Sequence, residues 1–284
     1  SQQAVFYGQS SWAGHVAKTA YPFGRTVFEP SPLNRILEQG AAGTSWQPVT
    51  GNNTGHTAKI AYDVNVVDEV KLWRPNGSGA SATYYDAGKL SKTITRDENW
   101  VPSDGKAGTS EEFKDFEGRI VLKRNWETDT KSLSTYYVYD DLGNLCYVLP
   151  PAVNEYTDKL TTPISSFTEA DNVFKQYIYG YHYDGRKRQI EKKVPGKGWE
   201  WLVYGKRDEV VLSQDSLQRA AGIWLFNKYD EKARLVMSGE LSSALGRAAM
   251  QSAVNSYTGA AWEKYTGSGT YGYDNGSYPQ TYTK

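Results

Sequence analysis

Apolar and polar residues alternate along most of this chain with a period of two, which is typical of β-strands. Every second residue from Tyr177 to Tyr183 is a tyrosine, and Trp199 and Trp201 follow the same spacing. Because successive side chains of a strand point to opposite faces, each of these aromatic sets is expected on one face of a sheet. Clusters of Gly, Pro, Asn and Asp separate the alternating stretches and predict turns between the strands.

One unit recurs in these stretches: an aromatic strand, a Tyr-Asp or related pair, a short turn, and then a basic residue and a β-branched strand. The clearest copy covers residues 137–148. The Asp or its equivalent stands at positions 86, 115, 140, 184, 205, 230 and 274, so the spacings are 29, 25, 44, 21, 25 and 44 residues. Since 44 is about twice 22, the underlying period is roughly 21 to 29 residues, the length of one hairpin with its connection.

The turn of this unit has a clear physical basis. Its Asp can accept hydrogen bonds from backbone N–H groups two or three residues later, and the Gly three positions on can close the hairpin in the left-handed conformation. Three copies have Lys187, Asp208 and Ala233 at the Gly position, where a left-handed residue costs about 1–2 kcal/mol. These hairpins are expected to use another turn or to accept the strain. In a divergent copy over residues 26–37, Ser31 replaces the Asp and Asn34 the Gly.

We therefore assign a structural role to the residues that form the repeated turns. Since the aspartates recur in the units, turn capping is favoured over catalysis. The assigned residues are Tyr85, Asp86, Gly88, Asp115, Gly118, Arg119, Tyr139, Asp140, Gly143, Tyr183, Asp184, Tyr229, Asp230 and Arg234.

The predicted fold class is mainly β, with serial antiparallel hairpins that form an extended, curved or spiralling sheet. Residues 1–105 form a β-rich region with divergent repeats, and residues 106–284 carry the repeat hairpins. Two short helical insertions are expected near residues 152–176 and 241–256. Thr168 can cap the first over residues 168–176. In the second, Leu245, Ala248, Ala249 and Ala253 fall at helical spacing within residues 243–255.

Composition and charge exclude several classes of protein. The 32 Lys and Arg residues balance 32 Asp and Glu residues, which argues against a nucleic-acid partner. No apolar run approaches the ~20 residues of a membrane helix, so no membrane insertion of this segment is expected. The single Cys146 excludes an intrachain disulfide and a multi-cysteine metal site, and it is expected to be an ordinary strand residue. No signal peptide opens the chain.

No arrangement of residues typical of catalysis is found in the sequence, so we expect no enzymatic activity, no cofactor and no metal. His15, His56 and His182 are scattered, and His182 is expected to be solvated or packed on the sheet. Glu111 and Glu112 are neighbours in a strand and point to opposite faces, so they cannot converge on one glycosidic bond.

Two features leave alternatives open. The basic cluster of residues 186–188 with Lys192 and Lys193 is either a solvated turn or a site for an anionic partner, and Asp184 and Glu191 offset its charge. The tryptophans Trp199 and Trp201 either fill a thin core or face a ligand such as a sugar ring.

The repeated unit resembles the YD repeats of RHS-type proteins, including those of animal teneurins, and more specifically the RHS proteins of Bacteroidetes-like bacteria. Residues 30–35, 97–100, 139–151 and 183–215 carry the resemblance, which extends over nearly the whole chain. It implies a β-rich scaffold whose hairpins form a long sheet that spirals into a hollow shell. Such a shell encloses a C-terminal toxin or other cargo, or forms an extracellular recognition surface.

The resemblance implies a non-enzymatic structural segment of a secreted or cell-surface protein, located outside the cell. We find no core-region motif, aspartyl self-cleavage segment or toxin domain, so an N-terminal portion of a larger shell is expected. Its partner would be the remainder of its own longer chain, including the cargo or toxin domain. The alternative is an adhesin module that binds a cell-surface glycan or protein through Trp199 and Trp201. A hydrolase, the third hypothesis, would require carboxylates that converge from different hairpins.

Overall fold

The computed structural model describes residues 2, 5, 19–49, 54–155 and 162–282 of the 284-residue chain. The predicted fold class is confirmed, because antiparallel β-strands in serial hairpins dominate these residues and the helices are short. The chain divides into two units, Ser1–Val138 with Leu149–Ser166, and Tyr139–Val148 with Phe167–Lys284. The division predicted at residue 105 falls inside the first unit.

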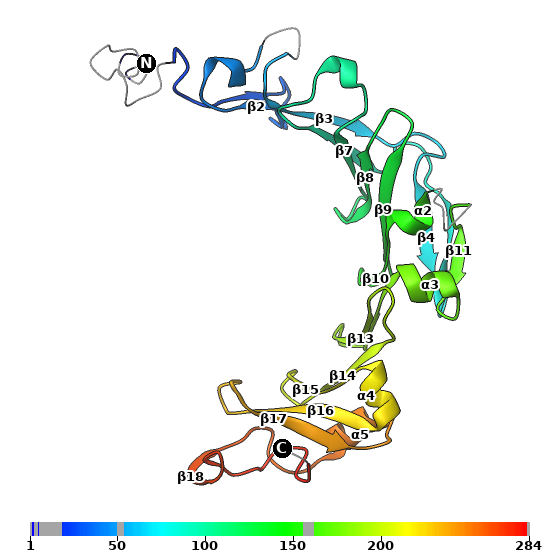
Figure 1. Cartoon of the computed structure of the whole chain (residues 1–284), viewed down its shortest axis with the longest axis vertical. Coiled ribbons are helices and arrows are strands. Elements are labelled where there is room, and N and C mark those ends of the chain that lie inside the picture. The colour runs from blue at the N-terminus through cyan, green and yellow to red at the C-terminus, as the bar shows by residue number, and fades with distance from the viewer. Residues whose placement is uncertain (1, 3–4, 6–18, 50–53, 156–161, 283–284) are drawn as a thin grey trace. The chain divides into compact units, whose positions relative to one another are not determined.

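The first unit is built on a sheet with the strand order β1-β2-β3-β6-β7-β8-β9 (Figure 1). Each neighbouring pair is antiparallel. The strands are β1 (Arg25–Phe28), β2 (Ile36–Gly40), β3 (Ala58–Val64), β6 (Ser91–Arg96), β7 (Thr109–Lys114), β8 (Ile120–Trp126) and β9 (Ser132–Tyr139). Short 3₁₀ helices, η2 (Thr44–Trp46) and η3 (Pro102–Asp104), lie in two of the connections.

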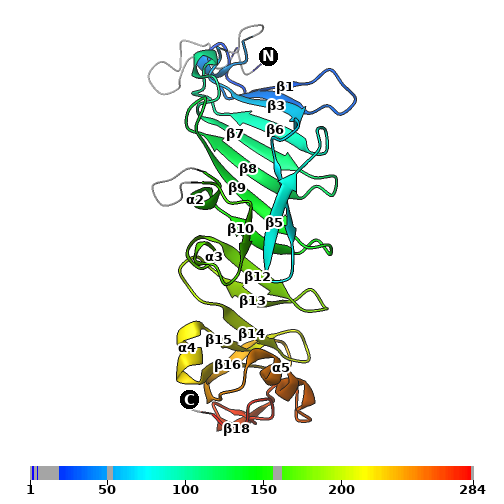
Figure 2. The same cartoon turned by 90° about the vertical axis from the view of Figure 1, so that its right-hand side faces the viewer.

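A second layer covers one face of this sheet. It is the hairpin of β4 (Lys71–Pro75) and β5 (Gly79–Tyr84), which crosses the strands of the larger sheet in Figure 2. The hydroxyl of Tyr136, on β9, accepts the backbone N–H of Lys71 at 3.3 Å and so connects the two layers. Apolar side chains from both layers form the thin core, and the buried ones include Val70, Trp73, Ala80, Leu90, Phe113, Leu122 and Val138.

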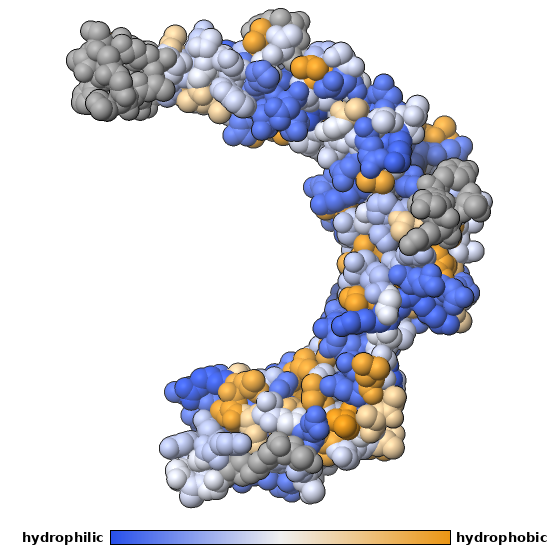
Figure 3. Space-filling model, in the orientation of Figure 1, coloured by the Kyte–Doolittle hydropathy of each residue, from blue (hydrophilic) through white to orange (hydrophobic). Residues whose placement is uncertain are grey.

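The second unit contains a sheet with the order β10-β12-β13-β14-β15-β16-β17. Its strands are β10 (Leu145–Leu149), β12 (Tyr179–Tyr183), β13 (Gln189–Lys193), β14 (Glu200–Tyr204), β15 (Val210–Gln214), β16 (Ile223–Tyr229) and β17 (Leu235–Ser242). Its largest core joins β14–β17 to helix α5 (Arg247–Ser256) through Val203, Leu212, Trp224, Phe226, Met237, Met250 and Val254. In Figure 3, hydrophobic residues gather over the α4 and α5 region of this unit, where α4 is Ser216–Ala221.

Helices lie in both predicted insertions, with corrected bounds. The first insertion contains α2 (Pro151–Asn154) and α3 (Asn172–Tyr177). Thr168 does not cap α3, because it ends the strand β11 (Ser166–Thr168) and donates its own N–H to the carboxylate of Asp171 at 2.7 Å. The tyrosine alternation therefore begins at Tyr179, since Tyr177 is the last residue of α3.

The predicted apolar face of α5 is wrong, and one helix was missed. Met250 and Val254 are the buried residues of α5, whereas Leu245, Ala248 and Ala249 are exposed. Helix α4 lies outside both predicted insertions. At its start, the carboxylate of Asp215 accepts the N–H groups of Leu217 and Gln218, and the Gln218 side chain accepts the N–H of Asp215. This is a capping box, and an Asp followed three residues later by Gln is its sequence pattern.

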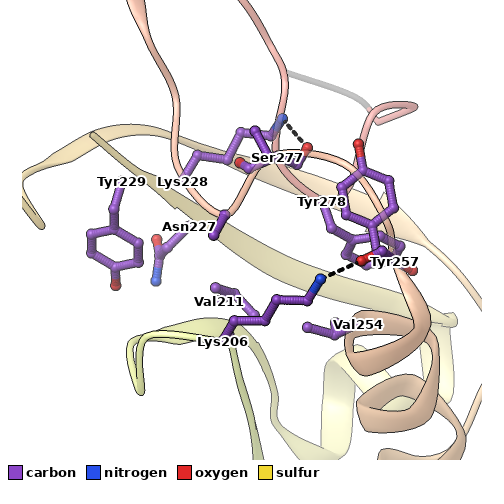
Figure 4. A pocket seen from close by; sticks show the side chains of 12 residues that line it. Lys206, Val211, Asn227, Lys228, Tyr229, Val254, Tyr257, Ser277 and Tyr278 are labelled. Atoms are coloured by element: carbon purple, nitrogen blue, oxygen red, sulfur yellow. Dashed lines mark hydrogen bonds between the residues drawn. The ribbon is translucent and has the colours of Figure 1, made fainter. Parts of the chain in front are cut away.

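A buried ion pair fixes residues 263–277 to the sheet of the second unit. The ammonium of Lys228, on β16, lies 3.0 Å from the carboxylate of Glu263, and neither side chain has exposed surface. Lys228 also donates to the carbonyl of Ser277 at 2.9 Å, which Figure 4 shows, and to the Asn275 side chain at 2.5 Å. Glu263 in turn accepts the N–H groups of Gly276 and Ser277. Residues 263–277 therefore depend on one lysine of the sheet.

The replacement Glu263→Gln is expected to lower the free energy of unfolding of the second unit by about 3 kcal/mol, because it leaves the buried Lys228 ammonium without its counter-charge. Hydrogen exchange of residues 257–282 and urea unfolding measure the effect. Glu231→Gln, the same change at an exposed position, is the control and should alter stability by less than about 0.5 kcal/mol. Equal stability of the two variants would contradict the proposed dependence.

Candidate functional site

The recurring turn is clearest between β7 and β8. One carboxylate oxygen of Asp115 accepts the backbone N–H groups of Glu117 at 3.0 Å and Arg119 at 2.9 Å, and the other accepts Nε of Arg119 at 2.8 Å. Gly118 has a φ of 79° and donates its N–H to the carbonyl of Asp115. The strand register shifts by one residue next to the turn, at Lys114. The turn is thus a tight loop with a left-handed residue and a bulge.

The same arrangement recurs at Asp140, Asp184 and Asp230. Each carboxylate accepts the N–H groups two and four residues later at 2.7–3.0 Å. Its second oxygen accepts a side-chain N–H from the residue four positions on, which is Asn144, Arg188 or Arg234. Burial acts to raise the pKa of Asp184, but the hydrogen bonds from Arg188 and from the backbone outweigh it and lower that pKa.

The copies without glycine accept the strain and keep this turn. Lys187, Asp208 and Ala233 have φ values of 60°, 66° and 59°, in the region where Gly143 has 80°. Each donates its N–H to the carbonyl three residues earlier, as the glycines do. At Lys187 and Ala233 the carboxylate of Asp184 or Asp230 and its hydrogen bonds fix the backbone although no glycine favours it. The turn at Asp208 has Gly205 in the Asp position and keeps the same backbone hydrogen bonds without a carboxylate.

In the divergent copy at residues 26–37, one residue differs from the prediction. Asn34 has a φ of 50° and takes the Gly position, and the hydroxyl of Ser31 accepts the N–H of Leu33 at 3.2 Å. The carboxylate, however, comes from Glu29, which accepts the guanidinium of Arg35 at 2.7 and 2.9 Å. Hydrogen bonds from Arg35 and Ser31 lower the pKa of Glu29 to about 2. The longer Glu side chain spans a turn with two extra residues.

The copy at residues 84–90 is not a hairpin turn, because it connects β5 to β6, which lie in different sheets. The Asp position is taken by Asn65, at the end of β3. Asn65 accepts the N–H of Leu90 on its side chain at 2.8 Å and that of Gly88 on its carbonyl at 2.9 Å. The carbonyl of Asp86 accepts a hydrogen bond from the Asn65 side-chain amide, and Tyr85 donates its N–H to the carbonyl of Val70. The β4–β5 hairpin is thus an insertion into a repeat turn.

The last copy, at Asp274, also departs from the pattern. Its carboxylate accepts the N–H groups of Lys264 and Gly276, and Tyr273 pairs with Tyr265. Asp274 therefore closes a local loop with β18 (Tyr265–Thr270) and does not begin a hairpin of the main sheet.

The tyrosine of the repeat connects each hairpin to the preceding turn. The hydroxyls of Tyr183, Tyr204 and Tyr229 donate to the carbonyls of Leu145, Gln189 and Val210 at 2.8–3.0 Å. Each acceptor is the fifth residue after the Asp position of the preceding turn. Tyr62 does the same in the first unit, toward the carbonyl of Ile36. Tyr139 ends β9 and is half-buried.

Basic side chains connect successive turns of the second unit in the same way. Lys187 donates to the carbonyl of Leu142 in the preceding turn at 2.9 Å. Arg186 and Arg188 form ion pairs of 2.9 and 2.6 Å with Asp208 in the following turn. The guanidinium of Arg207 donates to the carbonyls of Asp230 and Glu231 in the last of these turns. We call the four turns 140–144, 184–188, 205–209 and 230–234 with these links the turn ladder.

The basic cluster predicted at residues 186–188 is therefore part of this ladder, and its other members lie elsewhere. Lys192 pairs with Glu200 at 3.3 Å. Lys193 is buried and donates to the carbonyls of Phe174, Lys175 and Ile178 at 2.9–3.0 Å, at the end of α3. Burial lowers the pKa of Lys193 to about 8.

His182 is neither solvated nor simply packed, because two carboxylates hold its ring. The ring nitrogens lie 2.6 Å from Glu191 and 2.8 Å from Glu169, and the ring stacks on Trp199 at 4.4 Å. The Tyr147 hydroxyl donates to Glu169 as well. Burial would lower the pKa of His182, but the hydrogen bonds with both carboxylates outweigh it and raise that pKa to about 9. Glu191 lies opposite His182 in the pairing of β12 with β13, whereas Glu169 comes from the segment between β11 and α3.

The two tryptophans are half-buried, and each has a partner on its ring. Trp199 stacks on the imidazole and lies 5.8 Å from the ring of Phe174 on α3. Trp201 lies beneath the guanidinium of Arg219 at 3.9 Å and beside Trp224 at 6.1 Å. Both rings therefore contribute to packing between the sheet and the helices.

Reactive chemistry is limited in the part of the chain that the structure describes. Burial raises the pKa of the Cys146 thiol to about 11, so little thiolate forms at neutral pH. Carboxylates from different elements converge on His182, on Lys92 and on Arg188, and in each case a cation stands between them. Glu263 and Asp274 both accept the N–H of Gly276, and Glu263 is paired with the buried Lys228. No group of three or more His, Cys, Asp and Glu suited to a metal ion occurs among the described residues.

The N-terminal residues 1–62 match the family model DUF6443, a domain of unknown function that is associated with RHS/YD repeats. Together with the recurring turns, this match supports an RHS-type protein. No curated protein matches its sequence.

Several solved structures are distantly similar to this chain. The crystal structure of TcdB2-TccC3 is 14% identical over 77% of this chain and 8% of its own, with a TM-score of 0.47. A form without its hypervariable C-terminal region is 15% identical over 81% and 11%, with a TM-score of 0.42. The Photorhabdus luminescens Tc holotoxin pore is 11% identical over 78% and 13%, with a TM-score of 0.39. The chain spans about a tenth of the length of these proteins.

The left-handed position of the RHS turn gives a matched pair of predictions. Ala233→Gly should raise the free energy of unfolding by about 1 kcal/mol, because glycine removes the cost of a positive φ. Gly143→Ala should lower it by about 1 kcal/mol. Urea unfolding followed by tryptophan fluorescence measures both. If the two variants shift stability in the same direction, the left-handed residue is not what limits these turns.

The contacts of His182 with Glu169 and Glu191 predict that the free energy of unfolding depends on pH. Because the folded pKa of His182, about 9, is above its ordinary value, its contribution is complete below about pH 6.5 and is lost as the pH rises through 9. The loss should reach about 2 kcal/mol, given that the side chain is 32% exposed. The measurement is the difference in unfolding free energy between wild type and His182→Gln from pH 5 to 10. Lys193, whose lowered pKa favours stability at high pH, is present in both proteins, so its contribution cancels. A difference that does not change with pH would contradict it.

Proposed function

We propose that this RHS-type chain is a non-enzymatic structural segment of a longer secreted or cell-surface protein. It would contribute to a β-sheet shell that encloses a C-terminal toxin or other cargo, and its partner would be the remainder of its own chain. The turn ladder carries the proposal. Because each turn bonds to the next through residues of the repeat itself, hairpins can be added in series while the bonding at that edge stays the same.

The chemistry of the described residues supports a structural role. Asp115, Asp140, Asp184 and Asp230 use both carboxylate oxygens within their own turns, where backbone N–H groups and an arginine or asparagine side chain occupy them. The carboxylate pairs that converge on His182, Lys92 and Arg188 each have a cation between them, which leaves none of these pairs free to face a scissile bond. Glu263, which lies near Asp274, is neutralised by the buried Lys228. As for the membrane, no helix of the described residues combines the length and apolar character needed to cross it.

The adhesin alternative depends on aromatic rings that a glycan could stack on. For Trp199 and Trp201, one ring face is taken by His182 and by Arg219, so the structural role has the stronger support. A glycan array of the wild-type chain beside Trp199→Ala and Trp201→Ala tests the alternative. Binding that either substitution abolishes, with the fold retained, would favour it over the shell.

Protection of the cargo tests the shell proposal. In the full-length protein that contains this segment, we expect the C-terminal region to resist a protease that degrades it rapidly when it is expressed alone. The double variant Arg188→Ala, Asp208→Ala breaks the link between two turns of the ladder and should speed cleavage several-fold, while each lost exposed pair costs only ~0.2–1 kcal/mol.

Lys197→Ala is the matched control, because it removes an exposed cation next to the same hairpins but outside the ladder. It should leave the cleavage rate unchanged. Cargo that is cleaved as fast in the wild type as in isolation would overturn enclosure. Equal rates for the ladder variant and the control would show that the ladder does not hold the shell together.

A further inference from the structure

A charged pocket opens on the sheet of the first unit, between strands β6–β8, residues 65–70 and the loop 97–108. Its volume is about 450 Å³, within the range of small-molecule sites. Val66 and Ile94 supply apolar wall, and Trp126 lines the end near the loop. The pocket lies on the same face of the sheet as the ion network described next. Val66 and Glu69, which line it, belong to the segment that follows Asn65 in the split repeat turn.

Four side chains of the pocket neutralise one another. Lys92 lies 2.8 Å from Glu69 and 3.1 Å from Glu111, and Arg124 lies 3.2 Å from Glu111 and 3.6 Å from Glu69. Burial acts to lower the pKa of Lys92, but its hydrogen bonds with the two carboxylates outweigh this and raise that pKa. This part of the wall is therefore a satisfied, charge-balanced network with no capacity for a further ion.

Two more cations line the pocket and lack a carboxylate partner among the described residues. They are Arg96, on β6, and Lys106, in the loop. Four cations and two carboxylates thus line the pocket, which leaves two positive charges in excess. Asp129 is near Lys106 but accepts its backbone N–H, at 2.6 Å.

Aromatic rings hold these two cations without neutralising them. The guanidinium of Arg96 lies 4.6 Å from the ring centroid of Trp100, and the ammonium of Lys106 lies 4.3 Å from that of Trp126. Such contacts orient a cation through the ring quadrupole and leave its net charge available to an anion.

Two buried donors are also unsatisfied at this end of the pocket. Nε of Arg96 and Nε1 of Trp126 are buried and have no hydrogen-bond acceptor among the described residues. An unpaired buried N–H costs free energy, so a native protein seldom leaves one without a partner. Both belong to residues that line the same pocket as the excess charge, which points to an acceptor that binds there.

We propose that this pocket binds a tetrahedral oxyanion group, a phosphate or a sulfate, either as the free ion or as an ester on a sugar. The two excess cations can neutralise the charge of −2 of inorganic sulfate or the charge of −1 of a sulfate ester, and such a group has several acceptor oxygens for the guanidinium, the ammonium and the indole N–H. The site would give an RHS-type segment a ligand in addition to its structural role. The source of the group, a free ion or a sulfated sugar, is distinguished by the experiment.

Isothermal titration calorimetry of the chain, in low-chloride buffer, tests the proposal with inorganic phosphate, inorganic sulfate and N-acetylglucosamine 6-sulfate as separate probes. Wild type should bind at least one probe saturably. Lys106→Gln and Arg96→Gln should each weaken that binding at least about tenfold, because each removes a charge-assisted donor. Tighter binding of the sulfated sugar than of sulfate would identify a saccharide ligand, and equal binding a free ion.

Lys123→Gln is the matched control, since it removes one positive charge from β8 and Lys123 lines a different pocket. It should change affinity less than twofold. Lys106 is exposed, so Lys106→Gln is expected to keep the fold and decides the outcome even if Arg96→Gln does not. Absence of saturable binding to all three probes, or an equal loss of affinity in Lys123→Gln and Lys106→Gln, would overturn the proposal.

Discussion

One carboxylate determines the geometry of most of the hairpin turns. At Asp115, Asp140, Asp184 and Asp230 it accepts two backbone N–H groups and one side-chain donor, and the residue between them lies in the left-handed region whether or not it is glycine. Ala233 and Lys187 show that this restraint exceeds the cost of a positive φ. The turn type, the bulge beside it and the register of the two strands follow from the same set of hydrogen bonds.

The other recurring residues act between hairpins. Each tyrosine hydroxyl bonds to the strand that follows the preceding turn, and Arg188 bonds both within its own turn and to Asp208 in the next. The abundance of tyrosine and the zero net charge of the chain therefore have a common explanation. The repeat needs a hydroxyl on an aromatic stem, and it places an anion and a cation in most of its turns.

Local patterns were enough to predict the serial hairpins, the turn aspartates Asp115, Asp140, Asp184 and Asp230, and the left-handed position of Asn34. The sequence failed where a partner lies far along the chain. Asn65 replaces Asp86 because the β4–β5 hairpin separates the two halves of that turn. Glu169 reaches His182 only after α3 has folded back to the sheet, and Lys228 finds Glu263 across 35 residues. The side of α5 that packs is set by the shape of the sheet beneath it, which periodicity alone does not contain.

The ends of the hairpins opposite the repeat turns are built differently. There, the connection between β15 and β16 contains α4, and that between β6 and β7 contains η3 with the loop that completes the charged pocket. Neither connection takes part in the carboxylate turns. These segments are consequently suitable places to insert a foreign domain or an affinity tag, and a chain of this kind could gain new surface features there by insertion while its hairpin register stays unchanged.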